Sequence, residues 1–104
     1  MSEKFYKQIS ITKNMGTALI KIKLMPSSPE VNLEEIKEES EKIIAKGKGK
    51  RIVFEEEDIA FGLKAVITRF DIDEKDELEP IENKLAKIKN VSSAQVIDMR
   101  RAFG

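Results

Sequence analysis

The chain has 104 residues, and its 19 Lys and Arg residues balance 19 Asp and Glu residues to give a formal net charge of zero. This length suits one domain with a single core. Zero net charge argues against a protein that works by general attraction to nucleic acid or anionic lipid, although it allows a local basic patch.

The sequence contains no Cys, His or Trp. Disulfides, thiolate nucleophiles, Cys/His zinc sites and histidine bases are therefore excluded. We expect a binding or regulatory protein that is not an enzyme and needs no metal or cofactor. No apolar run reaches the length of a membrane span and no signal-peptide pattern opens the chain, so the expected location is the cytoplasm.

Residues 1–14 show no sustained apolar period, and a second Met follows at position 15. We interpret 1–14 as an extension outside a domain that covers 15–104, because chain ends are usually loose unless they are docked. An additional strand over residues 5–11 is the alternative.

A strand is predicted over residues 17–25, where Ala18, Ile20, Ile22 and Leu24 alternate with other side chains. A Pro- and Ser-rich loop follows. Asn32 has the character of a helix N-cap, with Glu35 three residues on. The predicted helix ends at Gly47.

The second half of the chain repeats this pattern. Strands are predicted over 50–57 and 63–72, and the second has two apolar faces, which indicates a central strand or a bulge near Arg69. Leu78, Ile81, Leu85 and Ile88 recur at helical spacing, so we expect a helix that begins between 76 and 80 and ends at Asn90. A last strand is predicted over 91–100.

The predicted order is strand, helix, strand, strand, helix, strand. Two right-handed strand–helix–strand crossovers interleave into one four-stranded antiparallel sheet with both helices on one face. The expected fold class is α+β, a ferredoxin-like βαββαβ sandwich. This fold hosts many functions and identifies none by itself.

Three charged stretches are weak candidates for sites. Residues 46–51 alternate Lys and Gly but lack phosphate-loop spacing and follow a helix. Residues 71–82 echo a calcium loop, yet Lys75 stands at a ligand position and Asp76 where Gly is needed. The four acids at 55–58 are typical of a solvated turn.

Phe61 and Gly62 lie in the predicted turn between the second and third strands. Phe61 is interpreted either as a lid that folds back onto the core or as an exposed apolar anchor for a partner. The two alternatives are equally favoured by the sequence.

Arg100 and Arg101 lie near the carboxy terminus. Two arginines there suit recognition of an acidic or phosphate-bearing partner. The alternative is an ordinary last strand with a frayed end. If the strand continues that far, alternation places the two side chains on opposite faces.

Four motifs in register, within residues 15–104, resemble archaeal elongation factor 1-beta. They are Met15-Gly16-Thr17, Met25-Pro26-Ser27-Ser28-Pro29, Ile59-Ala60-Phe61-Gly62-Leu63 and Val96-Ile97-Asp98-Met99-Arg100-Arg101. The resemblance implies a ferredoxin-like guanine-nucleotide exchange factor whose partner is the GTPase elongation factor 1-alpha. It implies no direct contact with nucleic acid or membrane.

The resemblance also implies site residues. Phe61, with Gly62 beside it, matches a turn aromatic that contacts the GTPase in the eukaryotic branch. That branch has a lysine near the carboxy terminus that disturbs the magnesium site. The corresponding position falls at about Gly104, so this role does not transfer. Arg100 and Arg101 are the nearby cations that match the archaeal pattern.

Other functions on this fold remain open from the residues alone. The main alternative is a regulatory module that binds a small ligand and dimerises through its sheet. An RNA-binding domain is disfavoured because paired exposed aromatics are lacking. An acyl phosphate hydrolase lacks a phosphate-binding turn.

Overall fold

The computed structural model describes residues 16–102, so the expected extension over 1–14 lies outside the described residues. The elements, in chain order, are β2 (Thr17–Pro26), α2 (Leu33–Lys46), β3 (Lys50–Asp58), the 3-10 turn η2 (Ala60–Gly62), β4 (Lys64–Asp73), α3 (Glu79–Ala86) and β5 (Val91–Ala102). The predicted βαββαβ order is confirmed.

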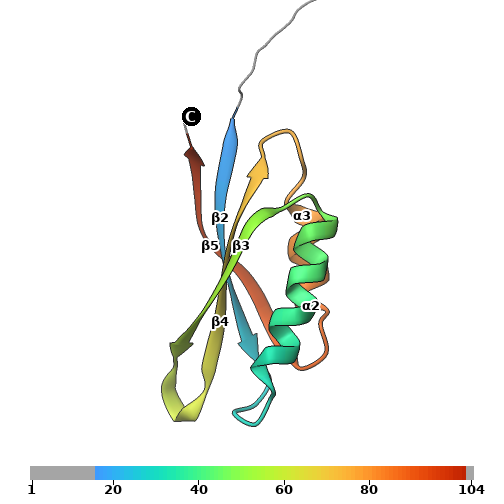
Figure 1. Cartoon of the computed structure of the whole chain (residues 1–104). Helices are drawn as coiled ribbons and strands as arrows, with labels where there is room; N and C mark the ends of the chain where they lie inside the picture. The colour runs from blue at the N-terminus through green and yellow to red at the C-terminus, as the bar shows by residue number, and fades with distance from the viewer. Residues whose placement is uncertain (1–15, 103–104) are drawn as a thin grey trace, which may run out of the picture.

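The four strands form one antiparallel sheet in the order β3-β4-β2-β5, with both helices against the same face (Figure 1). This is the predicted ferredoxin-like sandwich. β4 is an interior strand, as its two apolar faces indicated. The bulges lie in the other strands: the register shifts between Lys50 and Val53 in β3 and at two places in β5, around Ile97 and around Ser92, whereas Arg69 itself pairs with Lys21 and Val53.

The core lies between the sheet and the two helices. β2 contributes the alternating residues expected from its sequence, and the helices contribute one apolar stripe each. The fully packed cluster consists of Ile20, Ile22, Leu24, Ile36, Ile44, Val66, Phe70, Ile72, Ile81 and Leu85.

Both helices begin as predicted. The Asn32 side chain accepts a hydrogen bond from the backbone N–H of Glu34 at 3.0 Å, which caps α2, and Gly47 ends that helix. Pro80 lies in the first turn of α3, where its missing N–H costs nothing.

The predicted end of the second helix at Asn90 is wrong, because α3 ends at Ala86. The N–H groups of Lys87 and Ile88 donate hydrogen bonds to the carbonyls three residues before them, at 3.1 and 3.2 Å. This is the 3-10 pattern, which replaces the α-helical hydrogen bonds and ends the helix. Asn90 then adopts a positive φ of 72°. Ile88 still packs against the core, so the apolar spacing outlasts the helix.

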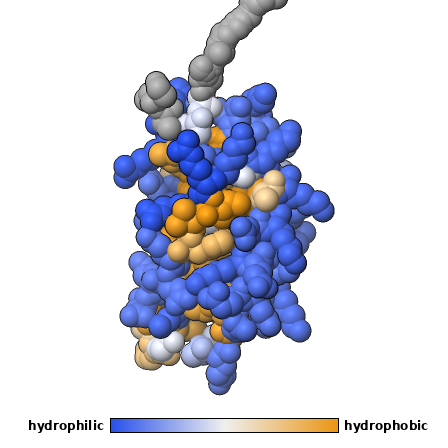
Figure 2. Space-filling model, viewed as in Figure 1, coloured by the Kyte–Doolittle hydropathy of each residue, from blue (hydrophilic) through white to orange (hydrophobic). Residues whose placement is uncertain are grey.

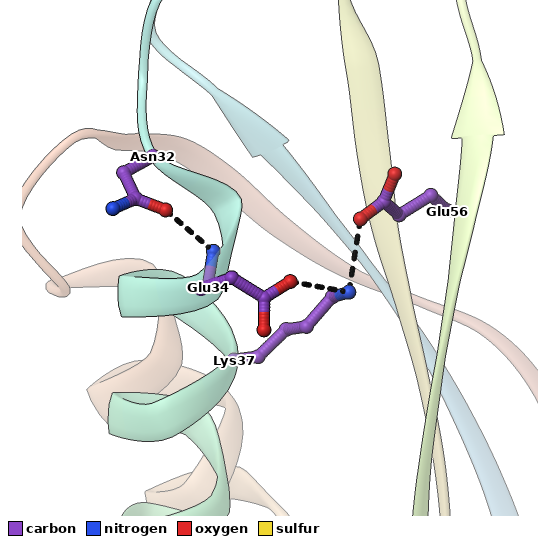
Figure 3. A network of polar contacts seen from close by, with 4 residues as sticks. All are labelled: Asn32, Glu34, Lys37 and Glu56. Carbon is purple, nitrogen blue, oxygen red and sulfur yellow. Dashed lines mark hydrogen bonds and ion pairs between the residues drawn. The ribbon is translucent and has the colours of Figure 1, made fainter.

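Lys37 ties α2 to the edge strand β3 (Figure 3). Its Nζ lies 3.0 Å from a Glu34 carboxylate oxygen and 2.9 Å from one of Glu56. The hydrogen bond to Glu56, and then that to Glu34, raises the pKa of Lys37 above its ordinary 10.5. The same Lys37 bond lowers the pKa of Glu56 below its ordinary 4.5.

The Lys37–Glu56 pair predicts a pH-dependent contribution to stability. Glu56 adds to the free energy of unfolding above its ordinary pKa of 4.5, and this contribution is lost as the pH falls through the lowered pKa of the folded state. Lys37 adds to the free energy of unfolding below its ordinary pKa of 10.5, and this contribution is lost as the pH rises through the raised pKa of the folded state. We expect Glu56→Gln to lower the free energy of unfolding at pH 7, with the difference from wild type shrinking in acid below 4.5. Urea melts across this range measure it, and a difference that stays constant down to pH 2 contradicts the assignment.

Residues 46–51 comprise the end of α2, a turn over 47–49 and the start of β3, as expected from their place after a helix. Gly49 is required there for packing. A Cβ atom at position 49 would overlap the Ile44 side chain and lie 3.0 Å from the Ile44 carbonyl oxygen and 3.1 Å from the Phe70 ring. These neighbours belong to the core and have little freedom to move.

Gly49→Ala is therefore predicted to lower the free energy of unfolding by about 1–3 kcal/mol, the usual cost of overpacking. Thermal denaturation followed by circular dichroism measures the change. Ser93→Ala, at an exposed position of β5, serves as the control and should change stability by less than about 0.5 kcal/mol. Equal melting temperatures for both variants would contradict the packing argument.

Candidate functional site

Phe61 projects from the tip of the β3–β4 hairpin, and its side chain is 93% exposed. The turn is closed by backbone hydrogen bonds from Ile59 to the Leu63 carbonyl at 2.8 Å and from Leu63 to the Ala60 carbonyl at 3.3 Å. The interpretation of Phe61 as a lid on the core is wrong. In Figure 2 this turn forms an apolar surface at the lower left of the molecule.

The backbone at Phe61 is left-handed, with φ 64° and ψ 32°, and Gly62 follows with φ 78°. A bulky residue in this region costs roughly 1–2 kcal/mol. Glycine bears the second left-handed position at no steric cost. The hairpin therefore places a large aromatic side chain in solvent, although neither packing contacts nor an unstrained backbone stabilise it there.

Arg100 and Arg101 lie within β5, which continues to Ala102, so the frayed-end interpretation is wrong for these two residues. Arg100 pairs across the sheet with Leu19 and Arg101 with Ala18. Directly opposed residues share a face, so the arginines lie on opposite faces, as predicted for a continuing strand. Arg101 lies on the helix-bearing face and Arg100 on the open face.

Each arginine is held by one carboxylate. Arg100 Nε lies 3.0 Å from an Asp98 carboxylate oxygen, and Arg101 Nε contacts the Glu74 carboxylate. Sequence reasoning missed Glu74, because it approaches from the loop after β4 and no local motif joins it to position 101.

The structure does not bring the four predicted site residues together. The turn between β3 and β4, which contains Phe61 and Gly62, lies at the lower end of the sheet, and the carboxy end of β5 lies at the upper end (Figure 1). The stretch of β4 from Lys64, beside the turn, to Asp71, which is level with Arg100, spans roughly 23 Å at the usual rise per strand residue. The candidate site is therefore two separate surfaces.

Ion pairs cover much of the open sheet face between these two surfaces. Arg51 Nε lies 3.3 Å from an Asp71 oxygen, Arg69 contacts Glu55, and Lys23 Nζ lies 3.1 Å from a Glu57 oxygen. The acids at 55–58 thus belong to β3 and not to a solvated turn. Three large apolar residues on this face, Leu19, Val53 and Ile97, are each about half exposed.

Several carboxylates of the stretch 71–82 have partners within the protein. Asp71 pairs with Arg51, Asp73 accepts a hydrogen bond from the Lys75 N–H at 3.2 Å, and Asp76 lies 3.9 Å from Lys48 Nζ. Within residues 16–102, no three side chains of the types that ligate metals are grouped together. No helix in that part of the chain has the length and apolar character to span a membrane.

Three comparisons relate this geometry to known proteins. A family model described as the EF-1 guanine nucleotide exchange domain matches residues 19–102. Elongation factor 1-beta of Methanocaldococcus jannaschii is 40% identical over 89 residues, covering 85% of this chain and 100% of that protein. Elongation factor 1-beta of Methanosarcina barkeri is 41% identical over 88 residues, covering 84% and 99%.

A solved structure shares the fold. The ACT domain from GTP pyrophosphokinase of Chlorobium tepidum matches with a TM-score of 0.52 at 17% identity, covering 76% of this chain and 96% of that one. At this identity the likeness concerns the fold alone.

Proposed function

The chain belongs to the EF-1 guanine nucleotide exchange family, and on this premise we propose that it promotes the exchange of GDP for GTP on elongation factor 1-alpha. The resemblance expected from four short motifs is confirmed. The observation that carries the proposal is the match of the exchange-domain model to residues 19–102, which include the whole sheet except its first two residues.

The proposed mechanism is a shift of a conformational population. A GTPase holds its nucleotide through a phosphate-binding loop and a magnesium ion. A protein that binds more tightly to the conformation in which these contacts are broken favours release. To move such a balance from 1:99 to 99:1 takes about 5.5 kcal/mol of differential binding. A few buried interface side chains supply this, without covalent chemistry and without a cofactor.

The two candidate surfaces have different roles in this proposal. Phe61 is the apolar anchor, because aromatic side chains that become buried dominate interface energies. Because Arg100 and Arg101 lie on opposite faces, one of them supplies a cation for the phosphate and magnesium region of the GTPase and the other contributes its charge to association. Both surfaces reach one partner only if that partner extends over roughly 23 Å, a distance well within the dimensions of a GTPase. Since the partner works in translation, we place this activity in the cytoplasm.

The direct test is the release of a fluorescent GDP analogue from elongation factor 1-alpha, followed by stopped-flow in the presence of excess GTP. We expect this protein to raise the release rate in a saturable manner. The control is the same protein after heat denaturation. Release at the spontaneous rate at every concentration of folded protein would refute the exchange function.

Phe61→Ala tests the anchor. Truncation of a hot-spot aromatic should weaken productive binding by roughly 2–4 kcal/mol, seen as a higher concentration for half-maximal exchange. The melting temperature should change little, because the side chain is exposed and the backbone there is already strained.

The matched control is Val53→Ala, which removes apolar surface from a residue that is 49% exposed on the open face, in the edge strand β3. It should leave the half-maximal concentration nearly unchanged. A large drop in the melting temperature of Phe61→Ala with exchange intact would instead assign Phe61 to the fold.

A further inference from the structure

Glu74 reaches Arg101 from the loop between β4 and α3. The contact runs from Arg101 Nε to a Glu74 carboxylate oxygen, with 64% of the arginine side chain and 33% of the glutamate side chain exposed. A guanidinium carries five N–H donors in a planar fork. A contact through Nε therefore leaves the four donors on the terminal nitrogens for a partner.

The first residues of the described chain hold Glu74 in place. The backbone N–H of Glu74 donates a hydrogen bond to the Gly16 carbonyl at 3.0 Å. A Cβ atom at position 16 would overlap the Glu74 carboxyl group. The absence of a side chain at Gly16 thus provides the space through which the carboxylate reaches Arg101.

Arg101 lines a partly apolar recess on the helix-bearing face. The recess has a volume of about 430 Å³, and its lining combines the apolar residues Ala18, Ile72, Leu78 and Met99 with the acidic residues Asp73, Glu74 and Asp76. Met99 pairs with Ile20 across the sheet and is 58% exposed. A partner that meets the guanidinium can therefore bury an apolar side chain next to it.

Arg100 has a simpler environment. Its Nε also contacts one carboxylate, at 3.0 Å, but this carboxylate belongs to Asp98 of the same strand. The pair lies on the open face, where further ion pairs flank it. Arg100 and Asp98 therefore provide a chemically matched comparison on the other side of β5.

We propose that Glu74 is a positioning residue for Arg101, and that Arg101, held by Glu74 and Gly16, is the cation that acts on the anionic nucleotide site of elongation factor 1-alpha. This inference rests on the proposed function. A guanidinium that is already oriented loses less conformational freedom on binding, so more of its interaction energy is available for displacing the nucleotide. Arg100 contributes to association through its charge.

The test is a double-mutant cycle in the GDP-release assay. Glu74→Gln keeps the size of the side chain and removes its charge, and should lower the maximal release rate roughly five- to tenfold, the usual coupling between residues in contact. The half-maximal concentration should change little. In an Arg101→Ala background, where the maximal rate is already low, Glu74→Gln should have no further effect.

Two more variants separate positioning from folding. Gly16→Ala should act like Glu74→Gln without loss of melting temperature, because the overlap is relieved by moving the end of a flexible side chain. Asp98→Asn is the matched control and should leave the maximal rate within twofold. Arg100→Ala should raise the half-maximal concentration in a salt-dependent way and leave the maximal rate nearly intact.

The inference is overturned if Asp98→Asn and Arg100→Ala lower the maximal rate while Glu74→Gln does not. It is also overturned if Glu74→Gln slows release equally with and without Arg101. Nuclear magnetic resonance of the Arg101 Nε–H group in the isolated protein provides a readout that needs no GTPase. A protected signal that disappears in Glu74→Gln and in Gly16→Ala supports positioning. A signal that is unchanged in these variants refutes it. This readout stays decisive even if the wild-type protein fails to release GDP and the proposed exchange function is refuted.

Discussion

The pairing of β2 on both sides is the constraint on which the rest of this structure depends. β2 is hydrogen-bonded to β4 along one edge and to β5 along the other. Its alternating residues Ile20, Ile22 and Leu24 are buried beneath the helices. Because side chains in a strand alternate with a period of two, a slip of one residue would turn this row to the open face. Burial of the row therefore fixes the register, and through it the face on which each residue near the end of β5 lies.

The bulge at Ile97 decides which arginine lies near the helices. Val96 pairs with Ile22, but Asp98 pairs with Lys21, so Ile97 is an extra residue in β5. Strict alternation from Val96 would place Arg100 on the helix-bearing face. With the bulge, Arg101 lies on that face and Arg100 on the other. The sequence predicts the strand and the opposite orientation of the two arginines, but bulges form through cross-strand pairing and no local pattern in this chain reveals them.

Much of the fold is readable from local patterns, and the candidate site is readable only in part. The alternation in β2, the cap at Asn32 and the end of α2 at Gly47 are properties of adjacent residues, and all three are correct. The exposure of Phe61 depends on a left-handed turn that the sequence permits without requiring. The Glu74–Arg101 contact depends on the register of two strands and on space above Gly16. Interactions of this kind emerge from the assembled sheet.

The distribution of charge indicates how a neutral protein achieves specificity with this fold. With 19 cations and 19 anions, the net field is weak, so association with a partner gains little from long-range steering. Many charges on the open face are already paired with an opposite charge. The free energy needed to remove water from such a pair is about as large as the free energy gained from a new contact. The two ends of the sheet differ from this face. One end presents an aromatic ring in water. The other presents the Arg101 guanidinium, whose terminal donors are not used by the Glu74 contact, in a partly apolar recess. We therefore propose that the ends of the sheet, and not its broad open face, are where short-range contact with a GTPase favours one conformation over another.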